Sequence, residues 1–146
     1  MLEVPAVRVD RASPLPAPAR PGDAGLDLRS TLQVTVPAAG GRALVPTGIK
    51  LELPPGHAGL VLPRSGLALA HGITCLNSPG LIDSGYRGEI GVILVNHDPR
   101  ADFEVHVGDR VAQLVVVRVE QVALVEYETL GASERADGGF GHTGVA

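Results

Sequence analysis

Thr31-Leu32-Gln33-Val34-Thr35-Val36 alternates polar with apolar side chains, and the chain then turns at Pro37-Ala38-Ala39-Gly40-Gly41. A period of two places every second side chain on the same face, which is typical of a strand with one buried side. The arrangement recurs at residues 49–53, where Pro54-Pro55-Gly56 ends the alternation. Because proline presets a turn angle and glycine permits a positive one, these stretches predict strands joined by tight turns.

Strand-like periodicity extends over most of the remaining chain. Further predicted strands cover residues 4–9, 58–62, 90–96, 104–107, 110–117 and 122–127. Residues 111–119 are apolar on both alternate faces, so this strand should be buried on both sides, against the domain or another subunit. Residues 65–70 alone favour a short helix, which Gly72 would end. Short strands spaced about ten residues apart are typical of an all-β sandwich or barrel.

The composition narrows the classes of function. The chain has 146 residues, a net charge of −4 and no basic run, which argues against a nucleic-acid partner. Its single cysteine, Cys75, cannot form an internal disulfide, and neither a secretory signal nor an apolar stretch of about 20 residues is present. We therefore expect a cytoplasmic protein without a membrane partner. Gly and Pro number 19 and 12, and only four residues are aromatic, namely Tyr86, Phe103, Tyr127 and Phe140. A core of small branched side chains follows.

The pattern stops after Leu130. Residues 131–146 are rich in glycine and contain one isolated ring, Phe140, so they cannot pack as an ordinary strand or helix. We predict a single β-barrel domain over residues 1–130 and a flexible C-terminal arm over residues 131–146 that orders when a ligand binds. A frayed terminus is the alternative.

Five segments combine glycine with Asp, Arg, Ser or an aromatic residue. They are Asp23-Ala24-Gly25-Leu26-Asp27-Leu28, Pro63-Arg64-Ser65-Gly66-Leu67-Ala68, residues 77–90 around Asp83-Ser84-Gly85-Tyr86, Gly108-Asp109-Arg110-Val111-Ala112-Gln113-Leu114, and the arm. Each has a structural alternative when taken alone. Asp83 could close an Asx-turn, Asn77 could be a turn residue before Pro79, and Arg64-Ser65 could be a surface arginine with a helix cap.

In this order, over some 120 residues, the five segments closely resemble the motifs of the homotrimeric dUTP diphosphatases (dUTPases). The resemblance implies a dUTPase-like distorted jelly-roll or β-clip barrel with one short helix and a flexible C-terminal arm. It also implies hydrolysis of dUTP to dUMP and diphosphate with Mg²⁺, in three sites per homotrimer that each draw residues from more than one chain.

The resemblance also assigns roles to residues. Asp83 would be the general base that activates water for attack on the α-phosphate, and Tyr86 would pack on the deoxyribose and exclude a ribose hydroxyl. Asn77 would read uracil within a hairpin whose contacts include Leu81, Ile82 and Gly91. Asp27 would hold Mg²⁺ through water. The remaining substrate-binding residues would be Arg64, Ser65, Gly66 and Gln113 on the phosphates, with Arg135, Phe140, Gly141 and Thr143 from the arm.

Some positions depart from the common family pattern. His142 stands where a serine usually precedes Thr143, Arg29-Ser30 where a small apolar residue is frequent, and Gly91 where a larger side chain is common. Two other functions stay open at this point, a relative of dCTP deaminase and a non-enzymatic trimeric binding module on the same scaffold. Asp83, Tyr86 and the Phe140 arm favour the dUTPase. Which subunit supplies each residue does not follow from the sequence.

Overall fold

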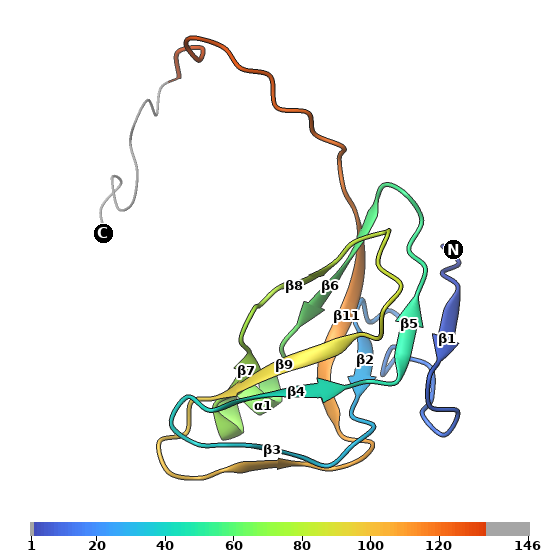
Figure 1. Cartoon of the computed structure of the whole chain (residues 1–146), viewed down its shortest axis with the longest axis vertical. Coiled ribbons are helices and arrows are strands. Elements are labelled where there is room, and N and C mark those ends of the chain that lie inside the picture. Colours follow the sequence, from blue (N-terminus) through green and yellow to red (C-terminus); the bar gives the residue numbers. More distant parts are fainter. Residues whose placement is uncertain (1, 134–146) are drawn as a thin grey trace.

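The computed structural model describes residues 2–133, and within them the chain forms strands and one short helix (Figure 1). The elements in chain order are β1 (Ala6–Arg8), β2 (Leu26–Arg29), β3 (Val34–Val36), β4 (Arg42–Pro46), β5 (Ile49–Leu51), β6 (His57–Leu62), α1 (Ser65–His71), β7 (Ile73–Cys75), β8 (Gly80–Ile82), β9 (Gly91–Asn96), β10 (Phe103–Val105) and β11 (Arg110–Arg118).

The strands form four antiparallel sheets. One sheet has the order β2-β11-β6-β8 and another has the order β4-β9-β7, while β1 pairs with β5 and β10 pairs with β3. The long strand β11 lies between β2 and β6, so it joins the start and the middle of the sequence in one layer. This arrangement confirms the all-β prediction and is that of a distorted jelly roll.

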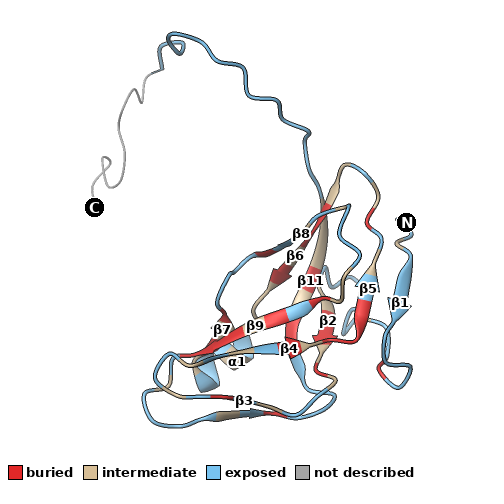
Figure 2. Cartoon of the chain, viewed as in Figure 1, coloured by how far each residue is buried: buried red, intermediate tan, exposed pale blue. Residues whose placement is uncertain are grey.

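The core lies between the two larger sheets (Figure 2). Its fully buried side chains are mainly leucine, isoleucine and valine, including Leu28, Ile90, Leu94, Val105 and Leu114. Burying one such side chain contributes about 1.5–3 kcal/mol. Phe103 is the one aromatic residue packed against this cluster within residues 2–133, as a composition with four aromatic residues predicts.

Most predicted strands are present with shifted ends, and the helix is present one residue longer than predicted. Gly72 ends it in the left-handed conformation (φ 64°) and donates its N–H to the carbonyl of Ala68, as the stop signal predicts. The sequence did not predict β4, β7 or β8. The prediction of two buried faces in residues 111–119 holds in the first half of β11, where Val111, Ala112 and Leu114 are buried, whereas Val119 is exposed.

The predicted strand at residues 122–127 is wrong for the described chain. After β11 the chain leaves the sheets, and residues 119–133 form no further strand (Figure 1). A strand needs a partner for its backbone groups, and within residues 2–133 none lies beside this stretch. Its apolar side chains are consequently exposed, as in Leu124 at 95% and Leu130 at 92%. We call residues 119–130 the exposed segment.

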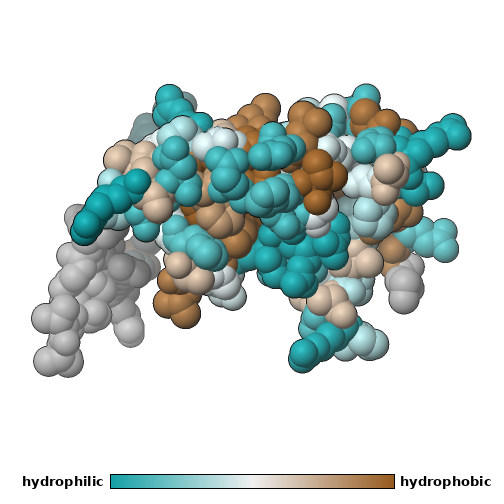
Figure 3. All heavy atoms as spheres, turned by 90° about the horizontal axis from the view of Figure 1, so that it is seen from below, coloured by the Kyte–Doolittle hydropathy of each residue, from teal (hydrophilic) through white to brown (hydrophobic). Residues whose placement is uncertain are grey.

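Apolar and hydrophilic side chains are mixed on the rest of the surface. The face seen in Figure 3 carries apolar side chains in separate groups among hydrophilic ones. Within residues 2–133, no helix has the length and apolar character needed to cross a membrane.

Candidate functional site

The first, second and fourth motifs meet on one sheet because of strand register. Gln113 on β11 pairs with Asp27 on β2 and with Leu62 at the end of β6, so the three residues form one row across the sheet. Arg64 follows two residues after Leu62. A side chain on Gly25 would lie 3.2 Å from the Gln113 carboxamide, so this glycine leaves room for the Gln113 amide. The structure therefore brings Asp27, Arg64 and Gln113 together.

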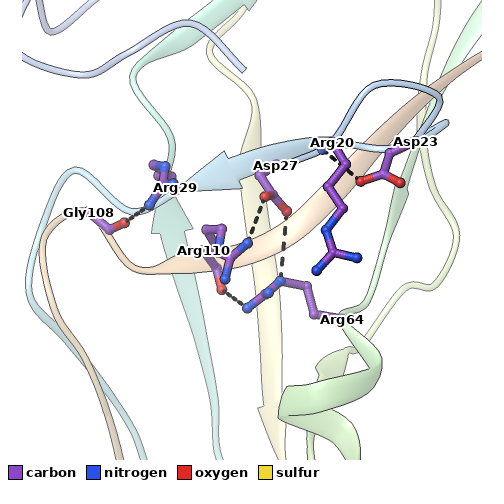
Figure 4. A network of polar contacts seen from close by, with 7 residues as sticks. All are labelled: Arg20, Asp23, Asp27, Arg29, Arg64, Gly108 and Arg110. Carbon is purple, nitrogen blue, oxygen red and sulfur yellow. Dashed lines mark hydrogen bonds and ion pairs between the residues drawn. The ribbon is translucent and has the colours of Figure 1, made fainter. Parts of the chain in front are cut away.

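Asp27 is the electrostatic centre of this group (Figure 4). We call Asp27, Arg64, Arg110 and Gln113 together the arginine cluster. The Asp27 side chain is only 7% exposed. Arg110 Nη1 donates to Asp27 Oδ2 at 3.2 Å, and Arg64 Nε lies 3.9 Å from Oδ1. Arg64 Nη1 also donates to the backbone carbonyl of Arg110 at 3.1 Å. One buried carboxylate thus fixes two guanidinium groups, which leaves net positive charge beside the phosphate-binding residues expected from the sequence.

Two further guanidinium groups, those of Arg20 and Arg29, lie next to the arginine cluster (Figure 4). The Arg20 guanidinium points towards the space between Asp27 and Arg64 (Figure 4). Arg29 and Arg64 help to line a pocket of about 290 Å³ together with Arg110. Arg29 also donates to the Gly108 carbonyl at 2.7 Å. The sequence places Arg110 in the fourth motif, with a role in structure or subunit contact rather than chemistry, whereas Arg20 lies outside the five segments.

The departure at Arg29-Ser30 has a structural explanation. Both residues hold the turn between β10 and β11, because Arg29 binds the Gly108 carbonyl and Ser30 exchanges backbone hydrogen bonds with Gly108 and Asp109. The Ser30 hydroxyl donates to the Leu32 carbonyl at 2.6 Å. These two residues therefore stabilise the end of the sheet that carries Arg110.

Helix α1 starts at the predicted phosphate-binding segment. Arg64 occupies the N-cap position in an extended conformation and makes no side-chain capping hydrogen bond. Ser65 and Gly66 are exposed at the first turn, and Gly66 has open space around its Cα. The backbone N–H groups of a first helical turn have no partner within the helix, so they can contact a bound phosphate.

The third motif forms a hairpin pocket lined by Leu81, Ile82, Asp83, Tyr86, Glu89, Ile90 and Gly91, with a volume of about 220 Å³. Asp83 follows β8 directly and is exposed, and its backbone carbonyl accepts from the Tyr86 N–H at 3.0 Å. That turn points Asp83 and Tyr86 into one pocket. Asn77 lies at the start of the same hairpin, close to Gly80, where a Cβ would be 3.3 Å from Asn77 Nδ2.

Gly91, a further departure from the family pattern, lies at the wall of the hairpin pocket. A Cβ on Gly91 would be 2.7 Å from Leu44 Cδ1. The exposed Leu44 side chain therefore occupies the space that a larger residue at position 91 would need.

Glu89 anchors the pocket, in keeping with a role in structure rather than chemistry. Its carboxylate accepts from the Gly48 N–H at 2.7 Å, and its backbone carbonyl accepts from the Tyr86 hydroxyl at 2.8 Å. The buried Thr47 hydroxyl donates to the Ile90 carbonyl at 2.6 Å. The sequence placed Glu89 in the motif but offered no sign that its partners lie in the turn between β4 and β5.

The arginine cluster and the hairpin pocket are far apart within one chain. Ile82 on β8 pairs with Gly59 on β6, so Asp83 falls beside Ala58, six positions before Arg64. Arg64 lies two residues past the end of β6, and an extended chain of six residues at about 3.3 Å per residue spans up to about 20 Å. Within one copy, the described residues that the sequence predicts for the site fall into two separate groups.

A larger hollow of about 520 Å³ is lined by residues that include Glu52, Ser84, Gly85 and Arg87. It contains an ion pair between Arg87 Nη2 and Glu52 Oε1 at 3.0 Å. Among residues 2–133, none of the site residues expected from the sequence lines this hollow, so its size does not make it the functional site. The predicted arm residues Arg135, Phe140, Gly141 and Thr143, and the departure at His142, lie outside the described residues.

The residues near the arginine cluster fit a water-mediated role towards Mg²⁺. Asp27 Oδ1 is buried and accepts no hydrogen bond, whereas Oδ2 is engaged by Arg110. Within residues 2–133, no three His, Cys, Asp and Glu side chains lie together as in a dedicated metal cage. A free acceptor beside positive charge suits a water molecule, and Mg²⁺ retains several of its waters when it binds phosphates.

Comparison with known proteins identifies the family. Residues 11–144 match the sequence profile of the dUTPase family. This chain belongs to the dUTPase family. Among similar dUTPases, the deoxyuridine 5′-triphosphate nucleotidohydrolase of Streptomyces coelicolor is 54% identical over 143 residues, covering 98% of this chain and 78% of that protein. The protein of the same name from Mycobacterium tuberculosis is 53% identical, covering 94% of this chain and 92% of that protein.

Solved dUTPase structures share the fold. The dUTPase of Staphylococcus bacteriophage 80alpha, determined with dUPNHPP, superimposes with a TM-score of 0.91 at 24% identity and covers 99% of this chain and 100% of that one. A variant dUTPase from phage phi11 of S. aureus, described with a structural Mg(II) ion, has a TM-score of 0.82 at 21% identity, over 90% of this chain and 100% of that one.

Proposed function

We propose that this chain is a dUTP diphosphatase, which hydrolyses dUTP to dUMP and diphosphate. The observation that carries this proposal is the family match over residues 11–144, supported by a hairpin pocket in which Asp83 and Tyr86 lie together. The pocket contains an exposed carboxylate, an aromatic ring and backbone groups of β8, as recognition of a nucleoside beside a general base requires.

Asp83 is the proposed general base. A water molecule in the pocket gives a proton to the Asp83 carboxylate while its oxygen forms a bond to the α-phosphorus. The bond from the α-phosphorus to the oxygen that bridges to the β-phosphate breaks, and diphosphate leaves with that bridging oxygen. Such a base contributes about 10²- to 10⁴-fold to the rate.

Recognition of the nucleoside is proposed for the rest of the hairpin. Asn77 offers an amide donor and acceptor to the uracil edge, and Leu81, Ile82 and Gly91 line or adjoin the same pocket. The Tyr86 ring is proposed to pack on the deoxyribose. A base with the wrong donor and acceptor pattern would leave buried polar groups unpaired, which gives strong discrimination.

The phosphates are proposed to bind at the arginine cluster. Arg64, Ser65, Gly66 and Gln113 supply a guanidinium group, a hydroxyl, backbone N–H groups and an amide. When bound to the triphosphate, Mg²⁺ would neutralise part of its charge. Asp27 would hold that ion through a water that donates to its free Oδ1. Arg135, Phe140, Gly141 and Thr143 of the C-terminal arm, residues 131–146, are proposed to close over the bound nucleotide.

We further propose that the active unit is a homotrimer with shared sites. The separation of up to about 20 Å between Asp83 and Arg64 supports this assembly, because a base must lie within about 3 Å of its water while the phosphates follow the α-phosphorus directly. We propose that a second copy supplies the arginine cluster to each hairpin pocket. The exposed segment, with Val122, Leu124 and Tyr127 between 74% and 95% exposed, also supports contact between copies. We place the protein in the cytoplasm, which its lone buried Cys75 supports.

The test is diphosphate release from dUTP, dCTP, dTTP and UTP in the presence of Mg²⁺, with wild type and Asp83→Asn. We expect selective turnover of dUTP and a loss of about 10²- to 10⁴-fold in the variant. Asp10→Asn makes the same chemical change in an exposed turn, where Asp10 accepts from the Ala12 N–H, and it should retain activity. Equal turnover of all four nucleotides, ammonia release from dCTP, or undiminished turnover by Asp83→Asn would contradict the proposal.

A further inference from the structure

The Tyr86 ring has a defined resting place rather than a free surface position. It is 43% exposed, and its hydroxyl donates to the Glu89 carbonyl three residues later. Between these two residues the ring crosses Gly88. A Cβ built on Gly88 would lie 2.5 Å from Tyr86 Cζ and 2.9 Å from Cε2, and would be closer still to the hydroxyl oxygen. The ring can therefore occupy this position only because residue 88 has no side chain.

The surface under the ring is itself fixed. The Glu89 carboxylate binds the Gly48 N–H, the Ile90 N–H donates to the Ile49 carbonyl at 2.9 Å, and Thr47 binds the Ile90 carbonyl. Ile90 and Thr47 are almost fully buried. Because the Glu89 carbonyl is held by the core, the hydroxyl that binds it is held too.

We propose that Gly88 determines the selectivity of the site for deoxyribose, by letting the Tyr86 ring lie low enough to close the space of a 2′-hydroxyl group while staying bonded to Glu89. This inference rests on the proposed function of the hairpin pocket. Gly88 is a positioning residue, because it acts through Tyr86.

An added methyl group at position 88 must displace the ring. Carbon atoms need about 3.5–4.0 Å between them, so relief of a 2.5 Å approach requires a movement on the order of 1 Å at the outer end of the ring. Movement of that size breaks the 2.8 Å hydrogen bond to Glu89 and changes the wall that faces the sugar. Turnover of UTP should rise relative to that of dUTP, because a hydroxyl group is small enough to use the space that opens.

The experiment compares the selectivity ratio, kcat/KM for dUTP divided by kcat/KM for UTP, in wild type and Gly88→Ala. We expect this ratio to fall at least tenfold. Gly85→Ala is the matched control, since a Cβ on Gly85 meets no atom within 4 Å and neither glycine has a positive φ. This control should keep the wild-type ratio. A merely structural role for Gly88 would lower both kcat/KM values together and leave the ratio unchanged, which would overturn the proposal.

A double variant shows whether Gly88 acts through Tyr86. In a Tyr86→Ala background, Gly88→Ala should change the ratio no further, because residues that act on one contact are not additive. An equal fall in both backgrounds would contradict the proposed route.

If Gly88→Ala does not fold, Tyr86→Phe tests the same contact from the other side. Loss of the hydroxyl releases the ring from Glu89 and should lower the ratio, whereas an unchanged ratio would overturn the proposal. Absence of any wild-type preference for dUTP over UTP would instead count against the proposed function itself.

Discussion

Two variants that are each inactive should recover activity when their chains assemble together. Asp83→Asn removes the proposed base, and Arg64→Ala removes a proposed phosphate ligand up to about 20 Å away in the same chain. If each site takes Asp83 from one copy and Arg64 from its neighbour, a site is intact when an Arg64→Ala chain gives the hairpin pocket and an Asp83→Asn chain gives the arginine cluster.

The size of the recovery follows from the symmetry of the proposed trimer. With equal amounts of the two chains and random assembly, the copy that supplies Asp83 and the copy that supplies Arg64 each carry the wild-type residue with a probability of one half. About one quarter of the sites are therefore intact. Co-expressed variants should therefore reach about 25% of wild-type dUTP turnover, measured as diphosphate released per site. The matched control pairs Asp83→Asn with the double variant Asp83→Asn/Arg64→Ala, in which no chain carries Asp83. If the mixture of the two single variants turns over dUTP only at the mean rate of the two variants measured separately, each site lies within one copy and the proposal of shared sites is contradicted.

Three other properties can be measured directly. Leu94→Ala removes a side chain that is 1% exposed in the core, and it should lower the free energy of unfolding by about 2–5 kcal/mol in urea titrations. Burial raises the pKa of the Cys75 thiol to about 11, so alkylation at pH 8.5 should be at least tenfold slower in the folded protein than in urea, and equal rates would contradict a buried thiol. Backbone N–H groups of Ala101 and Arg100 lower the pKa of Asp98, so its stabilising effect is present above the ordinary carboxyl pKa and is lost as the pH falls through the folded-state pKa. The melting temperatures of wild type and Asp98→Ala should accordingly converge in acid.

Local patterns predicted the elements whose signals lie within a few residues. The helix at Ser65–His71 follows from good helix formers before Gly72, and the first half of β11 follows from its apolar faces. Strand β4 was missed because Gly41 and Pro46 at its ends resemble turn residues. Strands β7 and β8 were missed for the same reason, because Gly72 directly precedes β7 and Pro79-Gly80 stands at the start of β8. The apolar run at residues 122–125 indicates a stretch suited to pairing, but such a pattern cannot say which chain provides the partner.

The same limit applies to the site. Sequence motifs named Asp83, Tyr86, Asp27, Arg64 and Gln113, and those residues fall into the hairpin pocket and the arginine cluster. Their division between two places depends on the pairing of β6 with β8 and β11, which no local pattern encodes. The partner of Glu89 could not be predicted for a related reason, since Gly48 lies 41 residues away in the sequence.

A newly made copy carries the exposed segment before it meets any other copy. Val122, Leu124 and Leu130 then stand in water on a stretch with a strand-like pattern and no partner within residues 2–133. An unpaired apolar strand can be captured by any open sheet edge, including those of unrelated proteins that are still folding. Assembly of the proposed trimer would therefore compete with aggregation, and the yield of soluble protein should depend on how quickly copies encounter one another after synthesis.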